Sequence, residues 1–157
     1  MAHAMGNPAD EAIQRFGLEA LDTCAELFVA TFNGPPWHDA WRPDQARAYL
    51  EDIVRSPGFM GFLLAVADRP VAFCVGRVNR WYQGDEYMVH EFGVRPEAQR
   101  RGYGTRLLAS VESAAAAAGC RAIVLLTRRD LPAAAFYAAH GFNVSPHIAL
   151  FYKALTR

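Results

Sequence analysis

Residues 94–105, VRPEAQRRGYGT, join an extended run of the chain to a helical run. Gly102 and Gly104 let backbone N–H groups turn into one concavity, the following helix adds its positive end, and three arginines add charge. We interpret this stretch as a cradle for a pyrophosphate. It matches neither GxxxxGKS/T nor GxGxxG, so it predicts neither a nucleoside triphosphate site nor a dinucleotide fingerprint. Spacing alone leaves an ordinary tight turn with a solvated basic surface as the alternative.

The residues on either side of this stretch predict strands and a crossover. Residues 62–67 and 71–75 form two extended runs separated by three residues, so an antiparallel hairpin is the simplest connection. Residues 87–94 form a third extended run. After the stretch, a helical pattern ends at Gly119, and residues 122–126 read as a buried strand. Strand, helix and strand in succession predict a parallel crossover.

Helical periods also appear nearer both ends of the chain. Apolar residues at three- and four-residue steps predict a helix that ends near Asn33 and a second helix that begins at Pro43. A last short helix is expected over residues 132–141, followed by extended runs at 142–144 and 148–155. The whole pattern predicts a mixed α/β fold, mainly antiparallel in its first half, with one parallel crossover in its second.

The composition is that of a globular protein. The chain has 157 residues, of which 52% are hydrophobic and 20% charged, enough to bury a full core. We expect a single domain over residues 8–157 and disorder over residues 1–7. Because 16 basic side chains balance 16 acidic ones, we expect no binding to nucleic acid or to a membrane.

Cysteine and histidine usage bears on location and metal binding. The three scattered cysteines fit neither a disulfide framework nor a CxxC metal site, which favours a reducing compartment. No apolar run approaches the length of a membrane span, so we expect a cytoplasmic protein. The five histidines show no HxH or HExxH spacing, and we expect no metal.

Two motifs in order carry a family resemblance. Residues 99–104, QRRGYG, resemble the Q/R-x-x-G-x-G/A signature of the GNAT superfamily of acetyl-CoA-dependent N-acetyltransferases. Residues 92–97, FGVRPE, resemble the strand and turn that precede this signature. Residues 133–142, AAAFYAAHGF, resemble the family's A-x-x-F-Y-x-x-x-G-F motif. The resemblance implies the GNAT fold, a twisted, mostly antiparallel sheet with flanking helices and its parallel crossover at the cofactor site.

The resemblance also implies that acetyl-CoA, the co-substrate, lies in a splay between the strands at 87–94 and 122–126. Backbone groups would hold its pantetheine arm and its pyrophosphate. The residues so assigned are Phe92, Gly93, Val94, Gln99, Arg100, Arg101, Gly102, Tyr103, Gly104, Thr105, Asp130 and Phe136. Two alternatives stay open. The arginine side chains could be solvated surface charges, and Asp130, where the family often has Asn, could be an ordinary helix-start residue.

The same resemblance assigns Tyr137 as the acid that protonates the departing CoA thiolate. Without the family match, a core tyrosine on an amphipathic helix is the simpler interpretation. A base is needed because an amine acceptor is mostly protonated at neutral pH. His90 and Glu91 are the candidates, and strand alternation places their side chains on opposite faces, with His90 sharing the parity of Phe92 and Val94.

An aromatic loop in the first half of the chain supplies the candidate residues for the acceptor. Trp37, His38 and Trp41 lie in an aromatic loop that could line an amine pocket, and packing in a core or a dimer interface is the alternative. We expect an N-acetyltransferase that acts directly on a primary amine of a small molecule. A non-catalytic domain that binds acyl-CoA and works through a protein partner is the second hypothesis. A homodimer and a monomer fit the sequence equally.

Overall fold

The computed structural model describes residues 10–156. The disorder expected for residues 1–7 lies outside the described residues. The contacts divide the chain into two compact units, one up to Leu126 and one from Thr127 onward. The expectation of a single domain over residues 8–157 stays a prediction.

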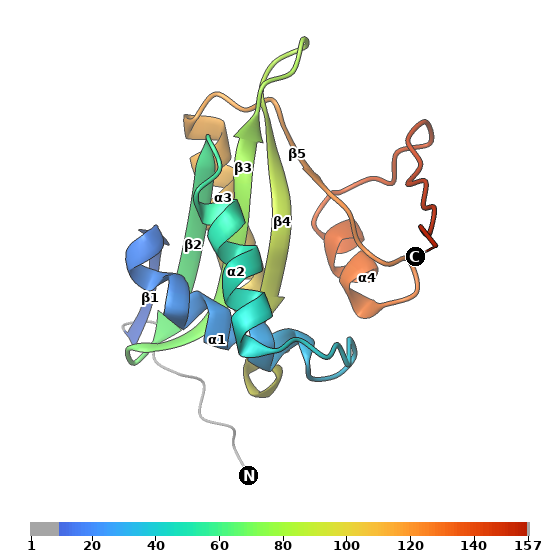
Figure 1. The fold of residues 1–157 in the computed structure, drawn as a ribbon. Coiled ribbons are helices and arrows are strands. Elements are labelled where there is room, and N and C mark those ends of the chain that lie inside the picture. Colours follow the sequence, from blue (N-terminus) through green and yellow to red (C-terminus); the bar gives the residue numbers. More distant parts are fainter. Residues whose placement is uncertain (1–9, 157) are drawn as a thin grey trace. The chain divides into compact units, whose positions relative to one another are not determined.

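The first unit contains a five-stranded sheet in the order β1-β2-β3-β4-β5 (Figure 1). Its strands are β1 (Glu11–Phe16), β2 (Phe59–Val66), β3 (Arg69–Asn79), β4 (Glu86–Val94) and β5 (Ala122–Leu125). Neighbouring strands from β1 to β4 are antiparallel, and β5 runs parallel to β4. The predicted hairpin, the mixed sheet and the parallel crossover are therefore confirmed.

Strand β1 was not predicted from the sequence. It lies at the edge of the sheet, where only Phe16 is buried, so its six residues carry little hydrophobic alternation. An edge strand with one exposed face gives a weak period-2 signal because it needs few apolar side chains.

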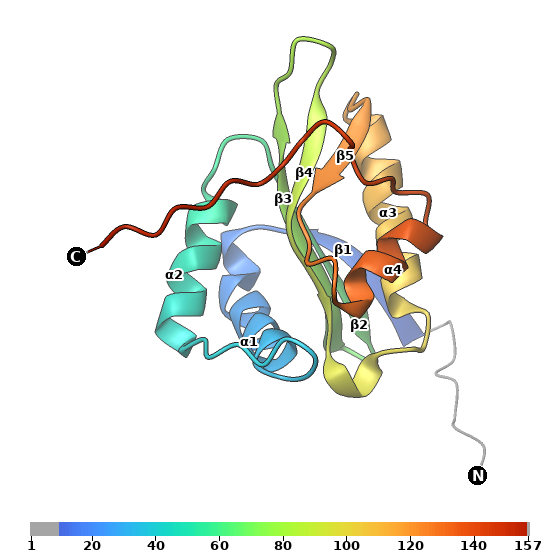
Figure 2. The same cartoon turned by 90° about the vertical axis from the view of Figure 1, so that its right-hand side faces the viewer.

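Helices cover both faces of this sheet (Figure 2). Helices α1 (Leu21–Phe32) and α2 (Pro43–Val54) pack on one face, and α3 (Tyr103–Ala117) packs on the other. The sheet separates two hydrophobic clusters. Phe28 and Phe73 belong to the cluster under α1 and α2, and Tyr87 and Leu107 belong to the cluster under α3. The predicted helices that end near Asn33 and begin at Pro43 are confirmed.

The second unit holds one helix, α4 (Pro132–Ala139), as predicted. The extended runs expected at residues 142–144 and 148–155 do not form strands. An apolar run becomes a strand only where a neighbouring strand completes its hydrogen-bond ladder, and residues 127–156 contain none. Six large apolar side chains there are exposed by 70% or more: Val144, Ile148, Leu150, Phe151, Tyr152 and Leu155.

Among residues 10–156, no helix has both the length and the apolar character needed to cross a membrane.

Candidate active site

The loop between β4 and α3 presents backbone N–H groups at the start of a helix. A 3-10 turn, Pro96–Ala98, follows β4, and two residues of the loop then have left-handed backbone angles, Arg100 with φ of 61° and Gly102 with φ of 84°. Gly102 is the N-cap of α3, and its carbonyl accepts from the N–H of Arg106 at 3.1 Å. The N–H groups of Tyr103 and Gly104 precede that bond and lie at the open, positive end of the helix.

Side-chain contacts of Gln99, Tyr103 and Arg106 stabilise the conformation of this loop. Gln99 Nε2 donates to the carbonyl of Val94 at 3.0 Å, and the ring of Tyr103 is buried in the cluster under α3. Arg106 covers that ring, 4.9 Å from its centroid, and makes two hydrogen bonds to Glu11 on β1. The side chains of Gln99 and Tyr103 therefore shape the loop, and their contribution to an anion site would come from the backbone.

The three loop arginines differ in their surroundings. Arg95 Nε donates to the carbonyl of Pro70 at 3.1 Å, which ties the loop to the first residues of β3. The side chains of Arg100 and Arg101 are exposed. Only the latter two are therefore available to a phosphate.

Strands β4 and β5 pair over only part of their length. Their parallel register runs from Glu86 opposite Ala122 to Val89 opposite Leu125 and ends there. Strand β4 continues to Val94, five residues further, while β5 stops. Within the first unit the two strands therefore diverge at the place where the sequence resemblance implied a splay.

A β-bulge lies at the same point of β4. Its register with β3 passes from Val89 opposite Gly76 to Glu91 opposite Val75, so His90 is the extra residue. The bulge reverses the side-chain alternation of β4, so odd-numbered residues before it and even-numbered residues after it face α3. Tyr87 and Val89 face the cluster under α3 before it, and Phe92 and Val94 face the same cluster after it.

The alternation expected for this strand is therefore wrong across residues 89–91. An uninterrupted strand would place Tyr87, Val89 and Glu91 on one face. The bulge instead turns Glu91 to the face covered by α1 and α2, where its partner Val75 belongs to the hydrophobic cluster. Sequence periodicity misses this because the extra residue carries no compositional signal.

Glu91 is held in a partly buried position beside α2. Tyr49 Oη donates a hydrogen bond to Glu91 Oε1 at 2.8 Å. Burial raises the pKa of Glu91 to about 7, and the nearby charge of Asp39 adds to the rise, while the hydrogen bond from Tyr49 opposes it. A carboxyl with this pKa is close to half ionised at neutral pH.

His90 has a different environment. Its side chain is exposed, and its pKa is lowered by partial desolvation and by the positive charge of Arg77 on β3. Arg77 Nε is itself buried and has no hydrogen-bond partner among residues 10–156. His90 is thus neutral at physiological pH and more accessible than Glu91.

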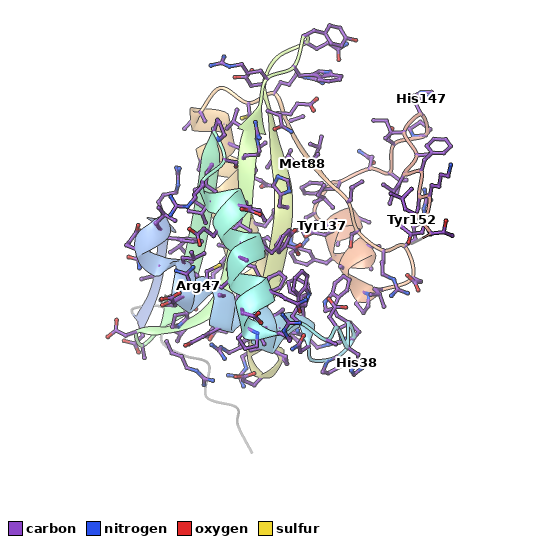
Figure 3. The ribbon with its side chains drawn as sticks, in the orientation of Figure 1. His38, Arg47, Met88, Tyr137, His147 and Tyr152 are labelled. Carbon is purple, nitrogen blue, oxygen red and sulfur yellow. The ribbon has the colours of Figure 1, made fainter. Side chains whose placement is uncertain are left out.

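The aromatic loop after α1 brings one of its three predicted residues to Tyr49, the hydrogen-bond partner of Glu91. Trp41 stacks on Tyr49 with ring centroids 5.3 Å apart and an interplanar angle of 20°. Trp37 instead packs against Phe32, and His38 is exposed in the loop that Figure 3 shows after α1. Tyr49 was not a sequence candidate, because a tyrosine on the apolar face of a helix has no distinguishing signal.

The second unit carries the remaining candidates. Tyr137 on α4 packs edge-on against Phe136 and Phe142, with centroids 5.3 and 5.4 Å away. Asp130 forms hydrogen bonds of 3.0 and 2.5 Å to Arg128, which hold the pKa of its carboxyl below the ordinary value. Asp130 does not cap α4, whose N-cap is Leu131.

Comparison with protein families gives one match over most of the chain. The model of the acetyltransferase (GNAT) family matches residues 21–142. The chain belongs to the GNAT family. Its expected enzyme class, an acetyl-CoA-dependent N-acetyltransferase, agrees with this membership. No curated protein sequence matches the chain.

Solved GNAT structures share the fold. AAC(6')-Iy in complex with a bisubstrate analogue, CoA-S-monomethyl-acetylneamine, superimposes with a TM-score of 0.72 at 18% identity, over 92% of this chain and 99% of that one. The aminoglycoside acetyltransferase meta-AAC0020 from an uncultured soil metagenomic sample, in complex with sisomicin, gives 0.73 at 17% identity over 94% and 98%. A possible acetyltransferase from Clostridium difficile 630 gives 0.78 at 14% identity over 93% and 99%.

The residues of this GNAT chain fit acetyl-CoA. The loop after β4 has a glycine with positive φ and a helix N-terminus without acidic residues in its first turn, which suits a pyrophosphate. The last residue of β4 that pairs with β5, Val89, immediately precedes the bulge at His90. The candidate cradle follows the C-terminal end of β4, and the candidate splay begins where the pairing of β4 with β5 ends, after Val89.

We predict that Glu91→Gln stabilises the protein more at pH 8 than at pH 5. Because burial raises the pKa of Glu91 from 4.5 to about 7, the wild type loses stability as the pH rises through that interval, and the variant does not. The difference in the free energy of unfolding between the variant and the wild type should grow by up to about 3 kcal/mol. Urea titrations followed by tryptophan fluorescence at the two pH values measure it.

The exposed Glu112 on α3 supplies a matched control. Glu112→Gln makes the same chemical change, and its effect should be similar at both pH values. An equal effect of Glu91→Gln at pH 5 and pH 8 would contradict the raised pKa.

Proposed function

We propose that this GNAT protein transfers the acetyl group of acetyl-CoA directly to a primary amine of a small molecule, with Glu91 as the general base. Acetyl-CoA supplies the acetyl group as an activated thioester, held by the backbone of residues 99–105. The observation that carries the proposal is the carboxyl of Glu91, partly buried beside a β-bulge and with its pKa raised to about 7.

Glu91 suits the base role better than His90 does. An alkyl ammonium has no lone pair, so a proton must leave the amine before it attacks. A base works best when its pKa lies near the operating pH, because it is then both ionised and able to hold a proton. Burial brings the pKa of Glu91 to this range, whereas desolvation and Arg77 lower the pKa of His90 and weaken it as a proton acceptor.

Tyr137 is the proposed acid. A phenol begins protonated at neutral pH and can donate as negative charge builds on the departing sulfur. The rings of Phe136 and Phe142 restrict the orientation of its side chain on α4. Support for this role comes from the match between residues 133–142 and the family motif.

The proposed acceptor is a small molecule with a primary amine. The names of two structural neighbours support this class, since one is in complex with sisomicin and another with a CoA–neamine bisubstrate analogue. Trp41, with Trp37 and His38 of the same loop, would contact the acceptor. The net charge of zero gives no reason to expect nucleic acid or membrane partners. We propose a cytoplasmic location and either a monomer or a homodimer.

We predict that acetyl-CoA and CoA, but not ATP, raise the melting temperature. A ligand that binds only the native state at a hundred times its Kd adds about 2.7 kcal/mol of stability. Gly102→Ala should weaken this effect, since a Cβ at φ of 84° strains the cradle. Thermal unfolding with each compound measures both.

Gly119→Ala is the matched control for strain. Gly119 follows the other end of α3 with φ of 83°, and no atom of the described part of the chain lies within 4 Å of a Cβ added there. It should lower stability without changing the response to acetyl-CoA. Equal loss of response in both variants, or no response in the wild type, would contradict the cradle.

We predict that Glu91→Gln lowers kcat/KM for the amine by about 10²–10⁴-fold, as expected for loss of a general base. His90→Gln should leave the acidic limb of the pH profile in place. Release of the CoA thiol is measured over a panel of primary amines that includes sisomicin. Loss of the acidic limb in His90→Gln instead would transfer the base role to His90. Tight acetyl-CoA binding without turnover on any amine would favour the non-catalytic alternative.

We predict that Tyr137→Phe lowers kcat more than it changes the affinity for acetyl-CoA. Phenylalanine keeps the aromatic packing and removes only the proton donor, so the loss is confined to the step in which negative charge develops. Single-turnover kinetics and a binding titration separate the two quantities. Unchanged single-turnover rates would exclude Tyr137 as the acid.

A further inference from the structure

Tyr49 is the polar side chain that contacts Glu91 across the layer between α2 and the sheet. It lies 42 residues from Glu91 in the sequence, and its hydroxyl donates to Glu91 Oε1 at 2.8 Å. The pKa of Tyr49 is itself raised, first by burial and then by the negative charge of Glu91. Tyr49 therefore remains a protonated donor throughout the pH range in which Glu91 ionises.

Aromatic packing fixes the ring of Tyr49. Trp41 stacks on it, and Phe28 lies 5.9 Å away at a tilt of 56°. Trp41 is anchored in turn by Asn33, whose Nδ2 donates to the Trp41 carbonyl and whose Oδ1 accepts from the Trp41 N–H, each at 2.9 Å. The hydroxyl of Tyr49 is thus held in place by ring contacts that do not depend on Glu91.

We propose that Tyr49 is a positioning residue, whose hydroxyl orients the carboxylate of Glu91 beside the bulge and stabilises its ionised form as acceptor of the proton of the amine. This inference rests on the proposed function, in which Glu91 is the base. A hydrogen bond to a carboxylate favours the charged form, and a buried carboxylate without it would stay protonated to higher pH.

Two side chains act on the ionisation of Glu91, and two more titratable or charged residues lie close to it in the register of the sheet. Tyr49 from α2 stabilises the carboxylate, and Asp39 from the loop after α1 destabilises it. On the sheet, His90 is its neighbour in β4, and Arg77 lies on β3 two residues beyond Val75, the partner of Glu91. Burial has a larger effect on the pKa of Glu91 than Tyr49 or Asp39 has. The hydrogen bond from Tyr49 therefore offsets part of the free-energy cost of a buried carboxylate.

The test is a pH titration of the Glu91 carboxyl by NMR in protein labelled with ¹³C at the glutamate carboxyl groups. The resonance that is missing from Glu91→Gln identifies Glu91. In Tyr49→Phe, the titration midpoint should move upward by about one pH unit, since a hydrogen bond to a charged group contributes at least this much. The ring and its contact with Trp41 are kept.

Tyr82→Phe is the matched control. Tyr82 is 84% exposed between β3 and β4, and its ring lies beside Trp81. The same loss of a hydroxyl there should leave the Glu91 midpoint unchanged. An unchanged or lowered midpoint in Tyr49→Phe would overturn the proposal.

Kinetics separate failure of this inference from failure of the proposed function. In Tyr49→Phe, the acidic limb of kcat/KM for the amine should move by the same amount, which gives about a tenfold loss at pH 6 that disappears near pH 9. A purely structural role would lower kcat/KM equally at every pH. If Glu91→Gln left turnover and the acidic limb unaltered, Glu91 would not be the base. A shifted NMR midpoint in Tyr49→Phe would then report only a structural hydrogen bond, and the positioning role of Tyr49 would also be overturned.

Discussion

The bulge at His90 is the constraint on which the site depends. It lies one residue beyond the last pair between β4 and β5. Within three residues, β4 therefore stops pairing with β5 and reverses which of its side chains face each side of the sheet. Without the extra residue, Glu91 would share the face of Tyr87 and Val89, in the apolar cluster under α3. The bulge moves this carboxyl to the other face and keeps Phe92 and Val94 packed against the cluster under α3.

A residue distant in the sequence offsets part of the free-energy cost of ionising the buried Glu91. A carboxylate moved from water into a protein interior is destabilised unless hydrogen bonds compensate it. Here one bond comes from Tyr49, and the remaining penalty appears as the raised pKa of Glu91. In the proposed mechanism the same penalty is what lets Glu91 act as a base, because a fully compensated carboxylate would be too weak a base to take a proton from an amine.

Much of the architecture could be predicted from local patterns. Helix starts at Pro43 and Pro132, the β2–β3 hairpin and the crossover through α3 follow from periodicity and from the stop signals of proline and glycine. The tight turn before α3 could be predicted too, since the positive φ at Gly102 is a conformation that glycine allows. Periodicity could not reveal β1, which has one buried side chain, nor the coil after α4, whose apolar residues resemble strands.

The site was harder to predict than the fold because its geometry depends on contacts between distant segments. The need for a base on the strand before the loop made His90 and Glu91 candidates, but only the register with β3 shows which face the carboxyl of Glu91 occupies. Tyr49 belongs to no sequence motif. Its proposed positioning role follows from the packing of α2 against the sheet and from Trp41, which stacks on Tyr49 and is held by two hydrogen bonds to Asn33. A sequence pattern identifies residues that repeat across a family, whereas the pKa of a buried carboxyl is set by whichever donors and charges the fold brings within a few ångströms. The chemistry of Glu91 is therefore a property of the tertiary structure.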